Sequence, residues 1–509
     1  MLPIEFFRRA AFSHPDKPAL IESGAVVTFR ELAARVDALA AGFLAIDPAP
    51  GSRVGICAGN GVDHIVALLA TLSAGKVWVP LNPKNGTREL DDIIAFTDPS
   101  IVVVDTGNAG RLAASGASLL VADPQSVAAD TQAGLEARHA GAAPYHASPP
   151  LDQTQAIKFT GGTTGAPKGV MQPYRSWNAN IVTQMFCYGL TPADRYLVVA
   201  PITHGTSTYM LPVLGAGGCI VFPSSTRAGG ILDAIEVFGI TILFMPPTLM
   251  YAVMTEQAAA PRNLGSLRYA VYGAAPMRGE KIVEARALFG DVVATTYGQT
   301  EAPQIATFMA PHQFRDPRNI GSVGRPTIMT EVAVLDPDGR RLPAGEMGEI
   351  SIRGDLVMTG YWRMPEKTAE AIRDGWLRTG DLGIIDTRGF VFLKDRARDV
   401  IITGGFNVYP GDVEAVLSRH PAIYDCSVFG VEDDKWGEAV HAAVQLRHGS
   451  VADAEEIIRF VKTEIGSVKA PKHIHFFDDL PRSSVGKLAK TDIRNAVLAR
   501  PRAATAQPL

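Results

Sequence analysis

The sequence predicts an α/β fold, in which a large N-terminal domain is followed by a smaller α+β domain. Short apolar runs rich in valine and isoleucine recur along the first part of the chain, among them "SIVVVD", "YLVVAP" and "ITILFMPP". Helical stretches such as "RELDDIIAF" and "GILDAIEVF" lie among them. This alternation is typical of βαβ units, a largely parallel sheet and right-handed crossovers. After Arg325 the pattern changes, which indicates a second kind of unit.

The N-terminal half contains three segments that bear on its organisation. A helix is expected in "TFRELAARVDALAAGFL", where Thr28 and Glu31 have the spacing of a capping box and one face carries Leu32, Val36, Leu39 and Phe43. The most apolar segment, residues 64–81, is interrupted by a glycine and a lysine, and it fits a helix that leads into a strand. Residues 124–150, rich in Ala, Gly and Pro, are expected to form a loose surface connection.

The C-terminal part is expected to contain two small units. "EVAVLDPDGRRLPAGEMGEISIRG" carries alternating strands with turn residues, which predicts a small antiparallel β unit. Beyond about Asp395 a helix is expected near "GDVEAVLSRH", with strands at "YDCSVFGV" and "AVHAAVQL". We therefore place the large domain at residues 1–395, with the small β unit inside it, and the small α+β domain at residues 396–509.

Composition limits the class of protein. With 509 residues, 47% of them hydrophobic, and a formal net charge of -4, the chain is expected to be globular and soluble, without a nucleic-acid surface. The cysteines lack metal-ligand spacing, so we expect free thiols in a reducing compartment; they are Cys57, Cys187, Cys219 and Cys426. No signal-peptide core and no membrane span are expected, so we predict a cytoplasmic protein. An oligomer is compatible with these features.

The segment "KFTGGTTGAPKGV", residues 158–170, is the first candidate for chemistry. It has no helical or strand period and too few apolar residues to fill a core. Its glycines, its threonines and Lys168 offer many hydrogen-bond donors, which suits a phosphate group; a flexible surface turn is the alternative. It is not a Walker loop, because no Lys-Ser or Lys-Thr follows the glycines.

Four other segments carry polar residues in loops. In "TTYGQTEAP", Tyr297 could cover a base and Glu301 could hold Mg²⁺, or the glutamate could be a solvated loop residue. In "WLRTGDLG", Asp381 could accept hydrogen bonds from ribose hydroxyls, or simply occupy a turn. "KDRARDVIITGGFNVYPGDVE" could be a hinge or an exposed connection. "PRSSVGKLAK" places Lys487 in a Ser/Gly loop, where a solvated charge is the alternative.

In this order, the segments resemble the motifs of the adenylate-forming (AMP-binding) superfamily, in its acyl- and aryl-CoA synthetase branch. The resemblance extends from "VPLNP" at residues 79–83 to Lys487. Gly161 stands where serine is usual, which removes a hydroxyl and leaves the backbone donors. The alternative is a relative that has kept the fold and has lost or altered its reaction.

The resemblance implies a two-step reaction with ATP, Mg²⁺ and CoA. A carboxylate attacks the α-phosphorus of ATP to give acyl-AMP and pyrophosphate, and a thiol, usually that of CoA, then displaces AMP. Two anions meet in the first step, so positive charge should dominate catalysis. The large domain would be the AMP-binding domain, and the small C-terminal domain would be mobile and would rotate between the two steps.

Site residues follow from the same resemblance. The β- and γ-phosphates would be held by Thr160, Gly162, Thr163, Thr164, Gly165 and Lys168. Gly273 and Ala274 would pass along the adenine, with Tyr297 stacked on it, and Asp381 and Arg396 would bind the ribose. Catalytic roles fall to Lys487, Glu301 and Thr300, and Mg²⁺ would be held by Glu301 and Thr164. Arg398 would lie at the hinge, where Asp or Lys is commoner. Gly404 and Gly405 would border the CoA channel, and Trp436 could contact the CoA nucleotide or be an ordinary surface residue.

The residues that match the family's acyl pocket are mostly apolar or neutral; they are His204, Gly205, Thr208, Tyr209, Phe244, Met245, Tyr272, Thr296, Pro303 and Gln304. A buried ammonium or second carboxylate would need a charged partner, so we expect an apolar monocarboxylic acid: fatty, aryl or alicyclic. The aspartate that amino-acid adenylation domains carry after the "PITH" position is absent. Tyr272 suggests a shortened pocket. Alternatives are an acyl-AMP former that loads a carrier protein, and a nucleotide-binding protein without turnover.

Overall fold

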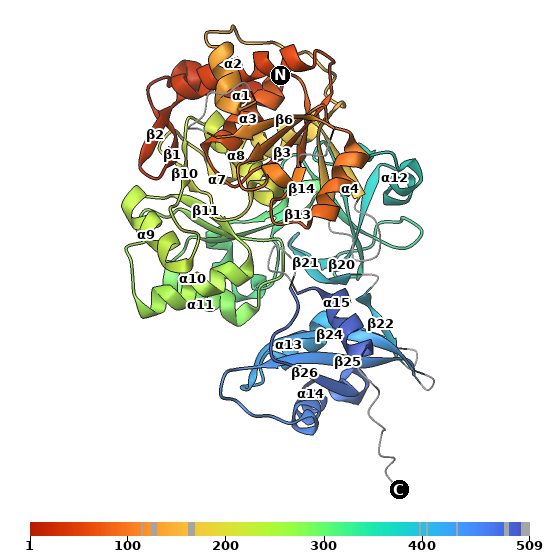
Figure 1. Cartoon of the computed structure of the whole chain (residues 1–509). Coiled ribbons are helices and arrows are strands. Elements are labelled where there is room, and N and C mark those ends of the chain that lie inside the picture. Colours follow the sequence, from red (N-terminus) through yellow and green to blue (C-terminus); the bar gives the residue numbers. More distant parts are fainter. Residues whose placement is uncertain are drawn as a thin grey trace. The chain divides into compact units, whose positions relative to one another are not determined.

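The computed structural model describes residues 1–112, 116–123, 130–160, 168–396, 399–403, 406–433, 436–482 and 488–499, with the backbone alone at residues 160, 396 and 407. The chain divides into two compact units (Figure 1). The first comprises Met1–Ala333, Ser351–Arg378 and Arg388–Val391, and the second comprises Val334–Ile350, Thr379–Thr387 and Phe392–Leu509. The domain boundary between residues 395 and 396 stays a prediction.

A nine-stranded sheet forms one layer of the first unit. Its strands run in the order β15 (Arg325–Pro326), β14 (Ala302–Met309), β13 (Val293–Gln299), β12 (Tyr269–Tyr272), β11 (Ile242–Met245), β9 (Arg195–Leu197), β10 (Cys219–Phe222), β1 (Pro18–Glu22) and β2 (Ala25–Thr28). The central pairs, from β13 through β12, β11, β9 and β10 to β1, are parallel. The expectation of a largely parallel sheet is thereby confirmed.

A seven-stranded sheet forms the second layer. Its order is β18 (Gly360–Tyr361), β8 (Lys168–Pro173), β7 (Thr154–Thr160), β4 (Val77–Pro80), β3 (Arg53–Cys57), β5 (Ile101–Asp105) and β6 (Ser118–Ala122). The pairs from β7 to β6 are parallel, whereas β8 runs antiparallel to both β7 and β18. The antiparallel end of this sheet carries the segment predicted to bind phosphate.

Helices cover both sheets, as the α/β prediction requires (Figure 1). The largest buried cluster joins inner faces of the two sheets to α1 (Pro3–Ser13), α2 (Phe29–Ile46), α3 (Val62–Ser73), α7 (Tyr174–Tyr188) and α8 (Ser207–Gly215). A second cluster packs α4 (Thr87–Thr97) and α5 (Ala109–Leu112) on the opposite face of the seven-stranded sheet. The nine-stranded sheet is contacted by α9 (Ala228–Phe238), α10 (Pro247–Ala259) and α11 (Gly279–Phe289). Shorter elements are α6 (Gln132–Arg138), α12 (Pro365–Ala371), the π-helix η1 (Ile202–Thr206) and the 3₁₀ helices η2 (Pro311–Arg315) and η3 (Pro317–Asn319).

Two further sheets complete the described chain. One has the order β16 (Glu331–Leu335), β17 (Gly348–Arg353), β20 (Trp376–Ile385) and β19 (Ile372–Arg373), with β21 (Val391–Arg396) also paired to β20. The other, in the second unit, has the order β23 (Phe406–Val408), β22 (Ile401–Thr403), β25 (Gly437–Leu446) and β24 (Ile423–Asp433), with β26 (His473–Phe477) on β25. The last sheet packs with α13 (Pro410–Leu417), α14 (Ala454–Lys469) and α15 (Lys490–Leu498).

Local sequence signals explain where several elements begin. The amide of Glu31 donates to Thr28 Oγ1 at 3.2 Å and the amide of Thr28 donates to Glu31 Oε2 at 2.8 Å, so the predicted capping box starts α2. The four apolar residues predicted for its inner face are all buried. The four cysteines are free thiols, as expected. The loose connection expected at residues 124–150 was wrong in part, because α6 lies there and Leu135 packs against Gly42 of α2.

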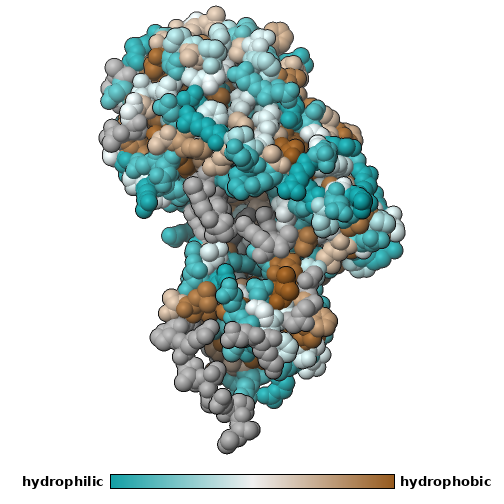
Figure 2. All heavy atoms as spheres, turned by 90° about the vertical axis from the view of Figure 1, so that its right-hand side faces the viewer, coloured by the Kyte–Doolittle hydropathy of each residue, from teal (hydrophilic) through white to brown (hydrophobic). Residues whose placement is uncertain are grey.

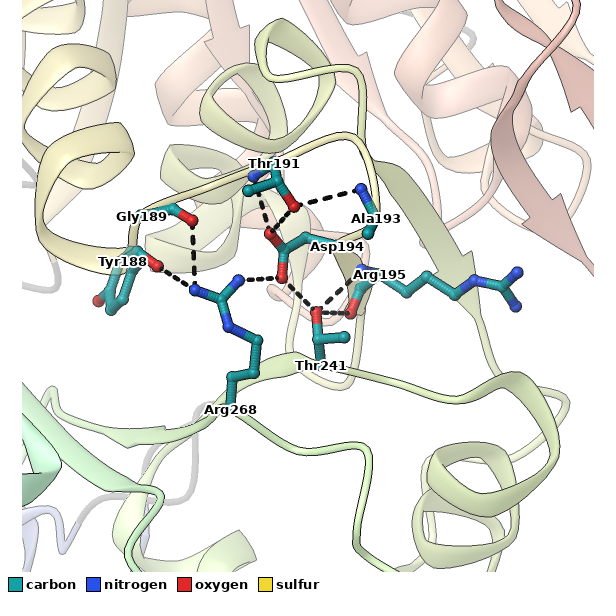
Figure 3. Close-up of polar contacts among 8 residues, drawn as sticks. All are labelled: Tyr188, Gly189, Thr191, Ala193, Asp194, Arg195, Thr241 and Arg268. Atoms are coloured by element: carbon teal, nitrogen blue, oxygen red, sulfur yellow. Dashed lines mark hydrogen bonds and ion pairs between the residues drawn. The ribbon is translucent and has the colours of Figure 1, made fainter.

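A buried carboxylate fixes the amino ends of three neighbouring parallel strands (Figure 3). Asp194, whose side chain is 2% exposed, directly precedes β9 and accepts hydrogen bonds from Arg268 Nη1 (2.6 Å) and Thr241 Oγ1 (2.8 Å). Thr241 precedes β11 and Arg268 precedes β12, and the amide of Thr191 donates to the other carboxylate oxygen at 2.8 Å. The carboxyl ends of the same strands carry segments of the candidate site, so this network helps to set their register.

The surface is mostly polar. Figure 2 shows one face, on which hydrophobic residues form small separate groups among hydrophilic ones. Exposed large apolar side chains such as Phe12, Phe186 and Val237 are scattered along the sequence. Within the described ranges, no helix is both apolar enough and long enough to cross a membrane.

Replacing Asp194 by alanine should lower the stability of the first unit by about 3 kcal/mol, because the Arg268 guanidinium and two threonines lose their acceptor. Asp16→Ala is the matched control: this carboxylate also pairs with an arginine, but its side chain is 80% exposed, so a change of less than about 1 kcal/mol is expected. Calorimetric melting of both variants measures the difference. Equal shifts would show that the Asp194 network is not a structural anchor.

Candidate active site

The predicted phosphate segment connects two paired strands. β7 and β8 are antiparallel, and their last register pair is Thr160 with Lys168, so residues 161–167 link the ends of a hairpin. The predicted phosphate ligands Gly162, Thr163, Thr164 and Gly165 lie outside the described residues, as does the side chain of Thr160. Lys168 lies at the base of the hairpin and is described fully.

Lys168 and Glu301 both contact Tyr361, which lies beside this hairpin. The Lys168 ammonium lies 5.2 Å from the centre of the Tyr361 ring, and the Tyr361 hydroxyl donates to Glu301 Oε1 at 2.8 Å. Burial and the nearby charge of Glu301 raise the pKa of Tyr361, so its phenol stays protonated and remains a donor. Lys168 and Glu301 were predicted from the sequence, whereas Tyr361 was not. The only local signal is the pair of aromatics after Gly360.

Backbone hydrogen bonds hold this group together. The amide of Trp362 donates to Gly169 O at 2.7 Å, and the amide of Met358 donates to Glu301 O at 2.8 Å. The carbonyl of Thr300 accepts from the side chain of buried Gln172 at 2.8 Å. Because the contacts come from three separate segments, the positions of the two charges depend on the pairing of β18 with β8.

The chemistry of Glu301 fits a magnesium ligand. One carboxylate oxygen is used by Tyr361, and the other accepts no hydrogen bond from any residue that the structure describes. Within the described ranges, no group of three His, Cys, Asp or Glu side chains could hold a metal ion. Mg²⁺ is commonly held by one or two carboxylates together with substrate phosphates and water. A single glutamate beside a phosphate hairpin matches that pattern.

The predicted adenine segment lies at the end of β12. A Cβ on Gly273 would stand 3.1 Å from the carbonyl oxygen of Thr296, so the strand that carries Tyr297 passes directly beside it. Ala274 is exposed and has a φ of +67°, which marks a turn there. Tyr297 is buried and interacts with another residue. These three residues therefore lie at or near the carboxyl ends of the neighbouring strands β12 and β13.

The structure gathers only part of the predicted acyl pocket. The rings of Tyr209 and Phe244 stack with centroids 5.6 Å apart, and Gln304 Nε2 donates to Tyr209 Oη at 2.6 Å and to Thr296 Oγ1 at 2.9 Å. Gly205 also faces this group, since a Cβ there would lie 3.3 Å from Gln304 Oε1. Thr208 Oγ1 donates to the carbonyl of Gly205, and Asn180 Nδ2 donates to that of Pro303. His204 is exposed at the preceding turn.

Met245 and Tyr272 lie on the other face of the same sheet. Phe244 pairs with Val271 in the register of β11 and β12, and Met245 pairs with Tyr272. Successive side chains of a strand point to opposite faces, so Tyr272 cannot share the face of Phe244. Its ring lies 6.4 Å from that of Phe314 instead. Val271 belongs to the same core cluster as Tyr209 and Phe244. Strand alternation places Val271, and not Tyr272, on the face of the sheet that carries Phe244.

A buried lysine adjoins both parts of the site. Lys158 of β7 is 5% exposed, and its ammonium donates to Ser207 Oγ (2.6 Å) and to the carbonyl of His204 (3.4 Å). The same ammonium lies over the rings of Trp78 and Trp177, at 4.9 and 5.6 Å from their centroids. No carboxylate of a described residue pairs with it. Burial lowers the pKa of Lys158 to about 7, and the indole faces oppose that shift because they favour the charged form.

The remaining predicted residues belong to the second unit. Asp381 is buried in β20, and its amide donates to Thr379 Oγ1 at 3.1 Å. Trp436 is 39% exposed, with the Lys472 ammonium 5.6 Å from its ring. Arg396 ends β21, and its side chain is not described. Lys487, Arg398, Gly404 and Gly405 lie outside the described residues.

The β7–β8 hairpin, with Lys168, Glu301 and Tyr361 beside it, is the geometry described for the segment that was predicted to bind phosphate. A family model described as "AMP-binding enzyme" matches residues 7–362, and one described as "AMP-binding enzyme C-terminal domain" matches residues 412–487. The chain therefore belongs to the AMP-binding enzyme family, whose members are ATP-dependent, AMP-forming enzymes.

Known proteins resemble this chain along almost its whole length. A feruloyl-CoA synthase of Amycolatopsis sp. is 35% identical, with 96% of this chain and 97% of that protein covered. The medium/long-chain-fatty-acid–CoA ligase FadD8 of Mycobacterium tuberculosis is 32% identical, with 94% and 87% covered.

Solved structures share the fold as well. ATP-bound MatB of Rhodopseudomonas palustris has a TM-score of 0.89 at 32% identity, with 97% of this chain and 99% of that chain covered. The amide bond synthetase McbA of Marinactinospora thermotolerans has a TM-score of 0.88 at 30% identity, with 97% and 100% covered. Proteins similar to this chain thus include CoA ligases and an amide bond synthetase.

Lys158→Met should change how stability depends on pH. The folded pKa of about 7 lies below the ordinary value of 10.5, so between these values the unfolded chain binds more protons at this site. Stability due to Lys158 therefore rises with pH through that window and is smallest below pH 7. The stability of the variant relative to the parent should fall as pH rises from 7 to 9, by up to about 1.4 kcal/mol per pH unit.

Melting temperatures of the parent and the variant at a series of pH values measure this difference. Lys84→Met, at an exposed lysine, is the control and should shift stability equally at every pH. A difference for Lys158→Met that does not vary between pH 6 and 9 would show that the folded protein keeps this lysine charged throughout.

Proposed function

We propose that this protein is an acid:CoA ligase, which activates an apolar monocarboxylic acid with ATP and transfers the acyl group to CoA. The observation that carries the proposal is the placement of Lys168 and Glu301 around Tyr361, at the base of the phosphate hairpin. The stacked pair of Tyr209 and Phe244 supports an apolar acid. The similarity to CoA ligases supports CoA as the acceptor.

In the first step, an oxygen of the carboxylate bonds to the α-phosphorus as the bond to pyrophosphate breaks. Both reactants are anions, so the residues that lower their repulsion are decisive. Lys168 would neutralise charge on the β- and γ-phosphates, and its distance from the ring of Tyr361 leaves the ammonium available to them. Bound Mg²⁺ would add positive charge at the phosphates, where Glu301 and Thr164 would hold it. Thr300 would contact the α-phosphate.

Lys487 would stabilise the charge that develops at the α-phosphate and the substrate carboxylate, a role that rests on the family motif. Asp381 and Arg396 would bind the ribose, and Gly273, Ala274 and Tyr297 would enclose the adenine. In the second step, the CoA thiolate would attack the acyl carbonyl and release AMP. Arg398 would act as the hinge between the steps, Gly404 and Gly405 would border the channel, and Trp436 would contact the CoA nucleotide.

A panel of aliphatic, alicyclic, benzoic and cinnamic acids, each incubated with ATP and Mg²⁺ with and without CoA, tests this function. We expect pyrophosphate release with a subset of acids, and acyl-CoA only when CoA is present. Lys487→Ala should slow pyrophosphate release by about 10²–10³-fold, because one charged donor to the transition state is lost. It should still convert supplied acyl-AMP and CoA to acyl-CoA.

The outcomes separate the alternatives. Pyrophosphate release that never yields acyl-CoA would assign the acyl group to another acceptor, either a carrier protein or an amine, as the likeness to an amide bond synthetase suggests. No release with any acid would overturn the proposal and favour a nucleotide-binding protein without turnover.

A further inference from the structure

Gln304 has an unusual backbone conformation. It lies in β14 with a φ of +68°, a left-handed conformation that is unusual for a residue with a side chain. The register of β13 against β14 shifts between Tyr297 and Gln299, and a Cβ on the intervening Gly298 would stand 2.7 Å from the backbone of Gln304. The backbone of Gly298 therefore passes close to that of Gln304, and unusual backbone conformations of this kind gather at ligand sites.

The carboxamide of Gln304 uses its donors within the protein. Both hydrogens of Nε2 are committed, one to Tyr209 Oη at 2.6 Å and one to Thr296 Oγ1 at 2.9 Å. Among the described residues, none donates a hydrogen bond to Oε1. That oxygen faces Gly205, at 3.3 Å from the position that a Cβ would take there. The amide is thus oriented by two hydroxyls, and its acceptor remains for a ligand.

Aromatic rings and glycines lie close to this acceptor. Phe244 stacks on Tyr209, and glycines lie at two edges of its ring: a Cβ on Gly205 would be 3.9 Å from Cε1, and one on Gly273 would be 3.1 Å from Cε2. Side chains at either glycine would crowd the ring. An aromatic acid would stack on these rings better than a flexible chain would, because aromatic pairs prefer offset or tilted contacts.

We propose that Gln304 Oε1 accepts a hydrogen bond from the substrate, which is an aromatic carboxylic acid that carries one hydroxyl or amino group on an otherwise apolar ring. This proposal rests on the proposed activation of a carboxylic acid. An acid without the donor would displace water from Oε1 and leave the acceptor unpaired. Sites that hydrogen-bond a substrate group discriminate strongly against analogues that lack it. Gln304 is half-buried, so we expect a preference of about 10- to 100-fold in kcat/KM.

Matched pairs of acids test the proposal. Benzoic and cinnamic acids with a hydroxyl at the ortho, meta or para position are each compared with the analogue that carries a methyl group there, and pyrophosphate release is measured. The wild-type protein should prefer at least one hydroxy acid by about 10- to 100-fold in kcat/KM. Gln304→Leu should abolish this preference, measured as the ratio of kcat/KM for the hydroxy acid to that for its methyl partner, and Gln304→Glu, which keeps an acceptor, should retain it. Gln257→Leu, which removes a carboxamide of α10, is the control and should leave the preference unchanged.

Each outcome decides between named explanations. Equal rates for hydroxy and methyl acids in the wild-type protein would overturn the role of Gln304 and leave the acid:CoA ligase function intact. A preference for acids with a methoxy group over those with a hydroxyl would overturn it as well, because the amide would then present its nitrogen. A hydroxyl preference that survives Gln304→Leu would assign recognition to another residue. Absence of release with every acid would reject acid activation itself.

Discussion

The pairing of β8 with β7 on one side and with β18 on the other is the constraint on which the candidate site depends. It places Lys168 at the base of the phosphate hairpin and Tyr361 directly beside it. Tyr361 then orients the carboxylate of Glu301, which arrives from the loop between β13 and β14. Lys168 and Glu301 are therefore positioned by backbone hydrogen bonds between segments that are distant in sequence.

Charge is unevenly distributed along this site. At the end where phosphate binding is proposed, the ammonium of Lys168 and the carboxylate of Glu301 lie beside the phenol of Tyr361. Toward the acid end, polar atoms are matched by neutral partners: Gln304 binds the hydroxyls of Tyr209 and Thr296, and Lys158 is held by Ser207, a carbonyl and two indoles. The end with Lys168 and Glu301 would thus favour the anionic phosphates, and the end with neutral partners would favour an uncharged acyl group. Electrostatics would orient the substrates in this way before specific contacts form.

The sequence predicted the elements whose signals are local. The α2 capping box and the valine-rich parallel strands needed no tertiary information. The loop expected at residues 158–170 was wrong at both ends, because residues 158–160 belong to β7 and residues 168–170 to β8, where antiparallel pairing stabilises them. Tyr361 was missed because only the pairing of β18 with β8 gives it a role, and α6 was missed because Leu135 is stabilised by packing on α2 rather than by its own sequence. The interpretation of Tyr272 overlooked the two-residue period of strands, by which Val271 faces the aromatic pair.

We propose that Lys168 and Glu301 hold the triphosphate of ATP rather than the nucleoside. Calorimetric titration of the wild-type protein and Lys168→Met with MgATP and, separately, with adenosine tests it most directly. We expect the variant to bind MgATP more weakly by about 10- to 100-fold, since a charge-assisted hydrogen bond is lost, and to bind adenosine as before. Unchanged affinity for MgATP, or an equal loss for both ligands, would contradict it.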